Sequence, residues 1–164
     1  MRRPLAILLA LAAFAADGDA LGRTDIVAVD DFIDAPRALF GRTREAVERA
    51  LGAPPTVRGR TLSAGPGPPA EAVDELAYPG LVVTVSHRST TVRGVQITQP
   101  RWTLPRALNV GVERRRVEET LGEPQLTSDA SVLYLDADGF PNTVEFHFRG
   151  DRVHRIEWSF AATD

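Results

Sequence analysis

The feature that most constrains this chain is a stretch of sequence that occurs twice. Residues 36–54 read PRALFGRTREAVERALGAP, and residues 105–124 read PRALNVGVERRRVEETLGEP. With a single extra residue in the second copy, both follow the pattern P-R-A-L, then G-x-x-R-x-x-V-E-x-x-L-G-x-P. Agreement over this length indicates an internal duplication, so we expect two related structural units.

Each copy predicts a short helix after the shared glycine. In the first copy Thr43 is a candidate N-cap, since its hydroxyl can accept a main-chain N–H of the first turn. Val47 and Leu51 lie four residues apart and form a narrow apolar stripe. Gly52 ends the helix in a left-handed conformation, and Pro54 prevents its continuation. The equivalent residues of the second copy are Val117, Leu121, Gly122 and Pro124.

Helices of about ten residues are marginal on their own, so each helix must pack on the strand-like sequence that follows it. We therefore expect Val47 and Val117 to be buried at equivalent places. The same expectation applies to Leu51 and Leu121.

The composition excludes several classes of site. The chain has 164 residues and no cysteine, which excludes disulfides, thiol catalysis and thiolate metal sites. A lipid anchor of the bacterial lipoprotein type also needs a cysteine. The formal net charge of -3 argues against nucleic-acid binding, which needs a concentrated basic face. The length fits one domain or two small lobes, and the duplication favours two lobes sharing one core or one sheet.

The first twenty residues have the pattern of a secretory signal peptide. Arg2 and Arg3 precede an apolar run at residues 5–14, which is too short to span a bilayer. Ala13-Phe14-Ala15 offers a cleavage site, so the mature protein should start between residues 16 and 21. The alternative is a buried N-terminal helix or a membrane anchor. A signal peptide predicts a bacterial protein that is periplasmic or secreted.

Two further segments are predicted from their composition. Residues 21–35 carry four aspartates among apolar residues and predict a short strand or a lead-in helix. Their aspartates form either a solvated face or an acidic binding patch. Residues 58–71 are crowded with glycine and proline and predict a loop. This loop is an insertion relative to the second copy, and it is either functional or the product of neutral drift.

Short β-branched runs bounded by turn residues predict three antiparallel strands in each unit. They are residues 73–78, 81–87 and 92–98 in the first unit, and residues 132–135, 143–148 and 153–160 in the second. The predicted fold class is α+β, with two tandem helix–three-stranded antiparallel meander repeats and the helices packed on one face of a sheet. The first repeat spans residues 21–98, a linker spans residues 99–104, and the second repeat spans residues 105–164.

This order of elements resembles the SmpA/OmlA (BamE) superfamily of small bacterial envelope proteins. The tandem doubling resembles that of β-lactamase inhibitory proteins, whose two units form a concave sheet. The matching positions are Gly41, Val47, Leu51, Gly52, Pro54 and Tyr78, then Gly111, Val117, Leu121, Gly122, Pro124 and Tyr134. These are scaffold positions, so the resemblance bears on the fold more than on the activity.

What the resemblance implies about function is protein binding, either inhibitor-like or assembly-factor-like. Two departures stand against a close match. BamE-type proteins are lipoproteins, and this chain lacks the cysteine for the anchor. The inhibitory proteins rely on disulfides, which this chain cannot form.

Polar residues in the second unit suggest three further sites, each with a simpler alternative. His147 and His154 flank the predicted turn at residues 150–151 and are either candidate metal ligands or ordinary strand positions; pairing Phe146 with Ile156 would separate them. Asp136-x-Asp138-Gly139 begins like a calcium loop but lacks the remaining ligands, which favours a plain turn. Residues 114–116 are three arginines that could contact lipid head groups or an acidic partner, or form a solvated helix face.

The candidate protein-binding residues are aromatic and arginine side chains in and near the strands, because these types dominate interface energetics. Trp158, Phe146 and Phe148 are expected in the core instead. The candidates are Tyr78, Trp102, Tyr134, Arg88, Arg93 and Arg155, together with the predicted loop at residues 58–71.

No nucleophile elbow or phosphate-binding loop is present in the sequence, so we do not expect an enzyme. The predicted function is an exported, non-catalytic protein-binding module of the bacterial envelope. Its expected partner is another envelope or extracellular protein, with no nucleic acid, no cofactor, no metal and no membrane span in the mature chain. The alternatives are a small-ligand or glycan-binding module in the cleft between the repeats, and a minor hydrolase.

Overall fold

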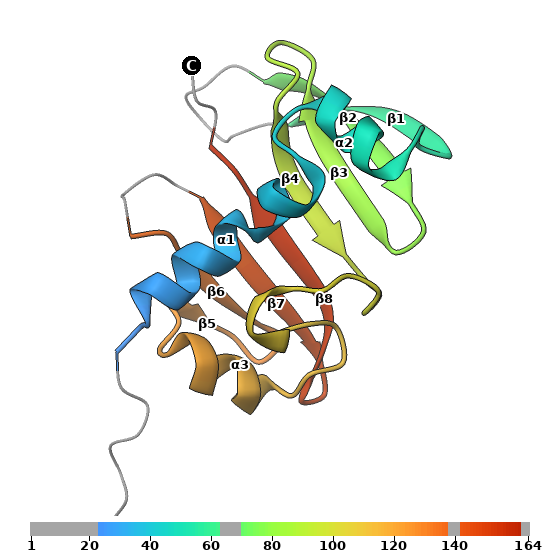
Figure 1. The fold of residues 1–164 in the computed structure, drawn as a ribbon. Helices are drawn as coiled ribbons and strands as arrows, with labels where there is room; N and C mark the ends of the chain where they lie inside the picture. The colour runs from blue at the N-terminus through green and yellow to red at the C-terminus, as the bar shows by residue number, and fades with distance from the viewer. Residues whose placement is uncertain (1–22, 63–69, 138–141, 162–164) are drawn as a thin grey trace, which may run out of the picture.

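The strands of the protein form one continuous antiparallel sheet. The computed structural model describes residues 23–62, 70–137 and 142–161. Within these ranges, eight strands pair in the order β1-β2-β3-β4-β8-β7-β6-β5, and all neighbours are antiparallel. Figure 1 shows the three α-helices on the same side of this sheet, with α1 lying between α2 and α3.

The first half of the chain contributes α1 (Ile26–Phe40), α2 (Arg44–Leu51), β1 (Thr56–Leu62), β2 (Glu71–Tyr78), β3 (Leu81–Ser86) and β4 (Val92–Ile97). The second half contributes the 3-10 turn η1 (Pro105–Ala107), α3 (Arg114–Leu121), β5 (Leu126–Thr127), β6 (Ser131–Leu135), β7 (Thr143–Arg149) and β8 (Arg152–Ser159). The predicted signal peptide at residues 1–20 and its cleavage site lie outside the described residues.

The predicted fold class is wrong, because the protein is not built as two helix–three-stranded repeats. Each half contributes four strands, and β4 and β8 join the halves into a single sheet. At this junction Val95 lies opposite Trp158 and Ile97 opposite Ile156, and all four side chains are buried. The apolar face therefore continues across the junction, so the two halves share one core and need no separate sheets.

Two strands were not predicted from the sequence, the two-residue β5 and the longer β1, whose residues 58–62 lie in the predicted loop at 58–71. The side chains of β1 are exposed at six of seven positions, so the apolar alternation that identifies a strand in sequence is absent. The main chain nevertheless pairs with β2 along its whole length, from Thr56 opposite Ala77 to Leu62 opposite Glu71. Residues 63–69 of the predicted loop lie outside the described residues.

The segment predicted as a strand or a lead-in helix is helical, and the helix is longer than expected. Asp25 caps α1 by accepting the N–H of Ala28 at 3.0 Å, and the helix continues through the first P-R-A-L sequence to Phe40. Its inner side is apolar, with Phe32 fully buried, while Asp31 and Asp34 lie on the exposed side.

A proline inside α1 is accommodated by a side chain from the other half of the chain. Pro36 has no N–H, so it cannot donate to the carbonyl of Phe32 one turn earlier. The indole Nε1 of Trp158 in β8 donates to that carbonyl at 3.0 Å. Because an unpaired buried carbonyl is costly, this bond lets the helix continue past the proline.

The two short helices after the shared glycines correspond closely. Thr43 caps α2 by accepting the N–H of Ala46, and both helices end where predicted, at Gly52 and Gly122. Val47 and Val117 are both 0% exposed, which confirms their expected burial. Leu121 is also fully buried, but Leu51 is only half-buried, so the expectation of equal burial fails at this pair.

The core lies between the helices and one face of the sheet. A single register row of this face runs across six strands through buried side chains, namely Leu76, Val83, Val95, Trp158, Val144 and Tyr134. From α1, Phe32 stacks on Phe146 and Trp158 with ring centroids 5.2 and 5.5 Å away. None of the helices in the described part of the chain has the length and apolar character to cross a membrane.

Candidate functional site

The face of the sheet opposite the helices is the candidate functional site, and we call it the uncovered face. The register places one row of side chains on it across all eight strands: Thr56, Ala77, Val82, Gln96, Glu157, Glu145, Leu133 and Leu126. None of these residues is buried, whereas the neighbouring row on the covered face is buried from β2 to β6. This difference leaves a broad face of mixed polar and apolar side chains that no helix of the described residues covers (Figure 1).

The uncovered face carries a charged cluster on β7 and β8, which we call the His147 cluster. Glu145 lies directly opposite Glu157, and His147 lies opposite Arg155. The Nε2 atom of His147 is 3.6 Å from Glu145 Oε2 and 3.5 Å from Glu157 Oε2. Arg155 Nε lies 3.6 Å from the same oxygen of Glu157, and the ring of His154 is centred 6.5 Å from that of His147.

The register explains this arrangement. Two like charges opposite each other destabilise a sheet, and the neighbouring guanidinium of Arg155 offsets the repulsion between the glutamates. A β-bulge shifts the pairing between His147 and Phe148, so His154 is not directly opposite His147. The expected pairing of Phe146 with Ile156 is confirmed.

Burial controls the charge of His147. Burial lowers the pKa of this imidazole below its ordinary value, an effect that Glu145 opposes and the positive charge of Arg155 reinforces. The ring is therefore neutral at pH 7, and its nitrogen can exchange hydrogen bonds with a partner without the cost of removing a full charge from water.

A second group of charges lies nearer the other end of the sheet. Arg93 donates from Nε to Glu71 at 3.1 Å, and Arg60 donates from Nη1 to Glu75 at 2.7 Å. The side chain of Arg93 is largely buried, with 14% of its surface exposed. It sits at an irregularity in the β3–β4 pairing, where Thr84 pairs with Gly94 but Val85 pairs with Val92.

Buried polar atoms on the uncovered face are left without partners. Arg93 Nη1, His147 Nε2 and Arg155 Nε are buried and have no hydrogen-bond partner among the described residues. A buried donor left unpaired costs about 1–3 kcal/mol. The nitrogens of His147 and Arg155 lie 3.5–3.6 Å from carboxylate oxygens of Glu145 and Glu157, so they are close enough for ion pairing but have no hydrogen bond.

The aromatic residues predicted to bind a partner lie on the covered side instead. Tyr134 is 0% exposed and donates its hydroxyl to the carbonyl of Gly122 at 3.0 Å, so it is a core residue and that prediction is wrong. Burial also raises the pKa of this phenol. Tyr78 is half-buried and makes the same bond to Gly52 at 2.9 Å. Trp102 is half-buried against the edge of Phe40, with ring centroids 5.9 Å apart.

The predicted arginines are divided between two regions. Arg93 and Arg155 lie on the uncovered face, as described above. Arg88 is exposed on the turn between β3 and β4. The structure therefore brings two of the six predicted residues onto one face, and it adds His147, Glu145 and Glu157, which the binding prediction omitted. Their alternation with Phe146 and Ile156 was the sequence signal that could have identified them.

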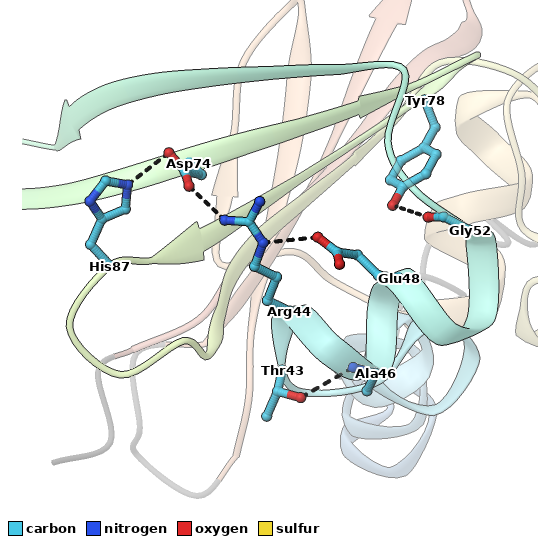
Figure 2. Close-up of polar contacts among 8 residues, drawn as sticks. All are labelled: Thr43, Arg44, Ala46, Glu48, Gly52, Asp74, Tyr78 and His87. Carbon is cyan, nitrogen blue, oxygen red and sulfur yellow. Dashed lines mark hydrogen bonds and ion pairs between the residues drawn. The ribbon is translucent and has the colours of Figure 1, made fainter.

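A polar network on the covered side holds α2 to the sheet, as Figure 2 shows. Arg44 donates to Glu48 at 2.9 Å and to Asp74 on β2 at 2.8 Å. His87 Nε2 lies 2.7 Å from the other oxygen of Asp74. The hydrogen bond from His87 and that from Arg44 lower the pKa of the Asp74 carboxyl. The network explains the position of α2, and its bonds are satisfied within the chain.

The histidines have few side chains of the kind that bind metals around them in the described part of the chain. Within residues 23–62, 70–137 and 142–161, no three or more His, Asp or Glu side chains are placed to hold a metal ion. No hydroxyl group in these ranges is hydrogen-bonded to His87 or His147, so neither histidine has a nucleophile to activate. The predicted calcium-like turn at residues 136–139 falls partly outside the described residues.

Among the described residues, depressions of the surface lie near the second half of the sheet. One of about 680 Å³ is lined by Glu113, Arg114, Arg115, Glu118, Arg149, Asp151 and Arg152. Another, of about 560 Å³, is lined by Arg23, Thr24, Ile26, Glu123, Gln125, Leu135, Asp136 and Ala137. Neither lies at the β4–β8 junction, where a cleft between the halves was considered.

The arginine run at residues 114–116 lines the first depression in part. Arg114 is engaged within the chain, because it donates to the carbonyls of Ser128 and Asp129 at 3.0 and 2.8 Å and lies over the ring of Phe148. Arg115 pairs with Glu119 at 3.5 Å on the surface of α3. Arg116 is exposed.

Comparison with known proteins gives no functional assignment. No family model matches the chain, and no curated protein matches it. Among solved structures, the chain is similar to the crystal structure of the uncharacterized protein yfeY from Escherichia coli, with 13% sequence identity and a TM-score of 0.41. The similarity covers 70% of this chain and 86% of that one.

Proposed function

We propose that this chain is an exported, non-catalytic protein-binding module of the bacterial envelope, and that its uncovered face binds the partner. The observation that carries the proposal is the set of buried nitrogens of Arg93, His147 and Arg155 on that face that have no hydrogen bond within the described residues. A partner that donates and accepts hydrogen bonds there would satisfy them. Arginine is also among the residue types enriched in protein interfaces.

Export and envelope location rest on the sequence of residues 1–20, with its two arginines followed by a short apolar run. The resemblance to small envelope proteins agrees with an inhibitor-like or assembly-factor-like role. The alternative of a small-ligand module has less support, because the two shallow depressions are charged or open and neither is a cleft between the halves. A hydrolase has less support still, because neither histidine engages a nucleophile among the described residues.

The test begins with capture of a partner. The mature chain is immobilised, exposed to envelope extract from its native source, and the retained protein is identified by mass spectrometry and purified. Its Kd is then measured for the wild type and for Arg155→Ala. The variant should weaken binding at least tenfold, about 1.4 kcal/mol, because the guanidinium lies in the His147 cluster at the centre of the proposed surface.

The matched control is Arg116→Ala, which removes an exposed arginine from α3 on the other side of the molecule. It should change the Kd by less than about twofold. Thermal unfolding of both variants checks that they remain folded. If Arg116→Ala abolished binding and Arg155→Ala did not, the binding surface would be the helical side and the proposal would fail.

A further inference from the structure

The strand β1 forms a long and unprotected edge of the sheet. It is the terminal strand in the sheet order, has seven residues, and pairs with β2 over its full length. No other strand of the described residues pairs with its outer side. The opposite edge is different, because β5 has only two residues. An edge strand presents unpaired N–H and C=O groups that can accept another strand.

The glycine in the middle of β1 has no explanation within the chain. Gly59 is not in the left-handed region, and a Cβ built on it would meet nothing closer than Asp74 Oδ1 at 3.9 Å. An alanine would therefore fit, and glycine in a strand interior weakens the strand. Glycine at such a place is typical of a position that another main chain approaches closely. Gly59 is therefore consistent with the pairing of another strand beside β1.

The charged residues of β1 indicate which kind of strand could pair with it. Arg58 and Arg60 both lie on the uncovered side of the strand, and Arg58 is opposite Glu75 while Arg60 bonds to the same glutamate. Only Arg60 makes an ion pair with Glu75 in the described part of the chain, so the positive charge of Arg58 is not neutralised there by an ion pair. Carboxylates on an added strand, spaced two residues apart, would lie beside both arginines.

The same charges disfavour pairing with a second copy of this chain. If two β1 strands paired antiparallel about Gly59, Arg58 of each copy would lie opposite Arg60 of the other. Pairing centred on either arginine would place like residues directly opposite. Like charges opposite each other destabilise a sheet, so a foreign acidic strand fits this edge better than a copy of itself.

The other side of β1 adds an apolar requirement. Val57 lies on the helix-covered side, opposite the buried Leu76, yet it is 44% exposed because the sheet ends there. An apolar side chain on an added strand would cover it. Since successive residues of a strand point to opposite faces, the edge fits a segment in which acidic and apolar residues alternate.

We propose that β1 binds an extended segment of a partner protein, with alternating acidic and apolar residues, as a ninth strand of the sheet. This inference rests on the proposed function, since it names the kind of partner that a protein-binding module would take. It places that contact at the edge, separate from the His147 cluster.

The test uses three synthetic seven-residue peptides with blocked ends, in which valine alternates with glutamate, lysine or glutamine. Each is titrated into the mature protein, and binding is followed by backbone amide chemical shifts and hydrogen exchange. The glutamate peptide should slow exchange within Thr56–Leu62 and bind at least tenfold more tightly than the lysine peptide. The double variant Arg58→Glu and Arg60→Glu should lose at least tenfold in affinity for the glutamate peptide and gain affinity for the lysine peptide.

The matched control is the double variant Arg116→Glu and Arg149→Glu, which makes the same change in net charge at two exposed positions away from β1. It should keep the preference for the glutamate peptide, with an affinity within about threefold of wild type. Equal affinity for all three peptides, or no protection of β1, overturns the proposal. Without peptide, amide exchange in β1 could also slow as the protein concentration rises, with dimers seen in sedimentation. That result would overturn the proposal and indicate that β1 pairs with a second copy.

Failure of this inference can be told apart from failure of the proposed function. A captured partner that is weakened by Arg155→Ala but not by the reversal at Arg58 and Arg60 keeps the uncovered face and excludes β1. A partner weakened by the β1 reversal but not by Arg155→Ala supports the edge and excludes the face.

Discussion

Residues 36–39 and 105–108 have the same sequence, P-R-A-L, and different structures. The first copy is the last turn of α1, a helix of fifteen residues. The second forms the 3-10 turn η1, in which Arg106 and Ala107 take left-handed φ values of 55° and 57°. Leu39 at the end of the first copy is 40% exposed, whereas Leu108 at the end of the second is 0% exposed.

The difference arises from what precedes each proline. Ten helical residues come before Pro36, so the helix is already formed and the first copy continues it. Leu104 precedes Pro105 in an extended conformation, which is the usual preference before proline. The second proline therefore starts a new turn at the position where its missing N–H costs nothing.

In contrast to the P-R-A-L copies, the residues after the shared glycines have the same structure in both copies. Arg44 N donates to Thr90 O at 2.9 Å, and Arg114 N donates to Asp151 O at 2.7 Å at the matching place. Tyr78 and Tyr134 each donate to the carbonyl of the glycine that ends the neighbouring helix. A repeated sequence therefore has the same structure where its contacts are also repeated. Where the contacts differ, the two copies have different structures.

The largest expected effect tests the divergent copies directly. Leu108→Ala should destabilise the protein by about 2–5 kcal/mol, because it removes a fully buried side chain and leaves a cavity. Leu39→Ala, in the same tetrapeptide, should cost less than about 1 kcal/mol because Leu39 is already partly in water. Urea unfolding of both variants measures the two free energies. Equal losses would mean that the two copies have the same environment, contrary to the structure.

A second prediction concerns how α1 tolerates its proline. Trp158→Phe leaves the buried Phe32 carbonyl without its donor and should cost about 2–3 kcal/mol. Pro36→Ala supplies a main-chain N–H to that carbonyl, so Trp158→Phe should cost about 1 kcal/mol less in the Pro36→Ala background. A double-mutant cycle of urea unfolding free energies measures this coupling. Pro105→Ala is the matched control, because Pro105 does not leave a helical carbonyl for Trp158 to bond. Additive effects of Trp158→Phe and Pro36→Ala would contradict the explanation.

The smallest expected effect is a pH-dependent contribution to stability from the ion pair that holds α2. Arg44 bonds to the carboxylate of Asp74, whereas Arg114 bonds to main-chain carbonyls. The pKa of Asp74 is lowered in the folded state from its ordinary value of 3.8, so its contribution is present above that value and is lost as the pH falls through the lowered pKa. Asp74→Asn should therefore cost about 1 kcal/mol at pH 7, and this cost should shrink as the pH falls below 3.8 and through the lowered pKa.

Urea unfolding of the wild type and Asp74→Asn between pH 3 and pH 7 measures this effect. Asp129→Asn is the control, since only the main-chain carbonyl of Asp129 holds Arg114. It should show no pH-dependent difference from wild type. A cost of Asp74→Asn that is the same at every pH would show that the loss is steric and not electrostatic.

The elements that the sequence predicted well are those with strong local signals. Both short helices end at Gly52 and Gly122 because glycine readily takes the left-handed conformation there, and Val47 and Val117 follow the helical period into the core. The strands with apolar alternation were also located from their period. The strand β1 was missed because an edge strand is exposed on both faces, so its period carries no apolar signal.

The candidate site was harder to predict because it depends on which face of the sheet the helices cover. Large aromatic residues suit both a core and an interface. From the sequence, Tyr134 was a candidate interface residue, although it lies in the core. The charged residues of the His147 cluster come together only through the pairing of β7 with β8. The strand period indicates which of these residues share a face, but the bulge between His147 and Phe148 also affects how they lie relative to one another.

Local sequence was enough to predict where the two short helices stop, which residues alternate between two faces of a strand, and that two stretches are related. Those properties depend on main-chain conformation and side-chain period, which act over a few residues. Three features became visible only in the folded chain: β4 pairs with β8 to make one sheet, Trp158 donates to the carbonyl that Pro36 leaves free in α1, and β1 forms an open edge. Each of these depends on contacts between residues far apart in the chain, where burial and hydrogen bonding outweigh local preference.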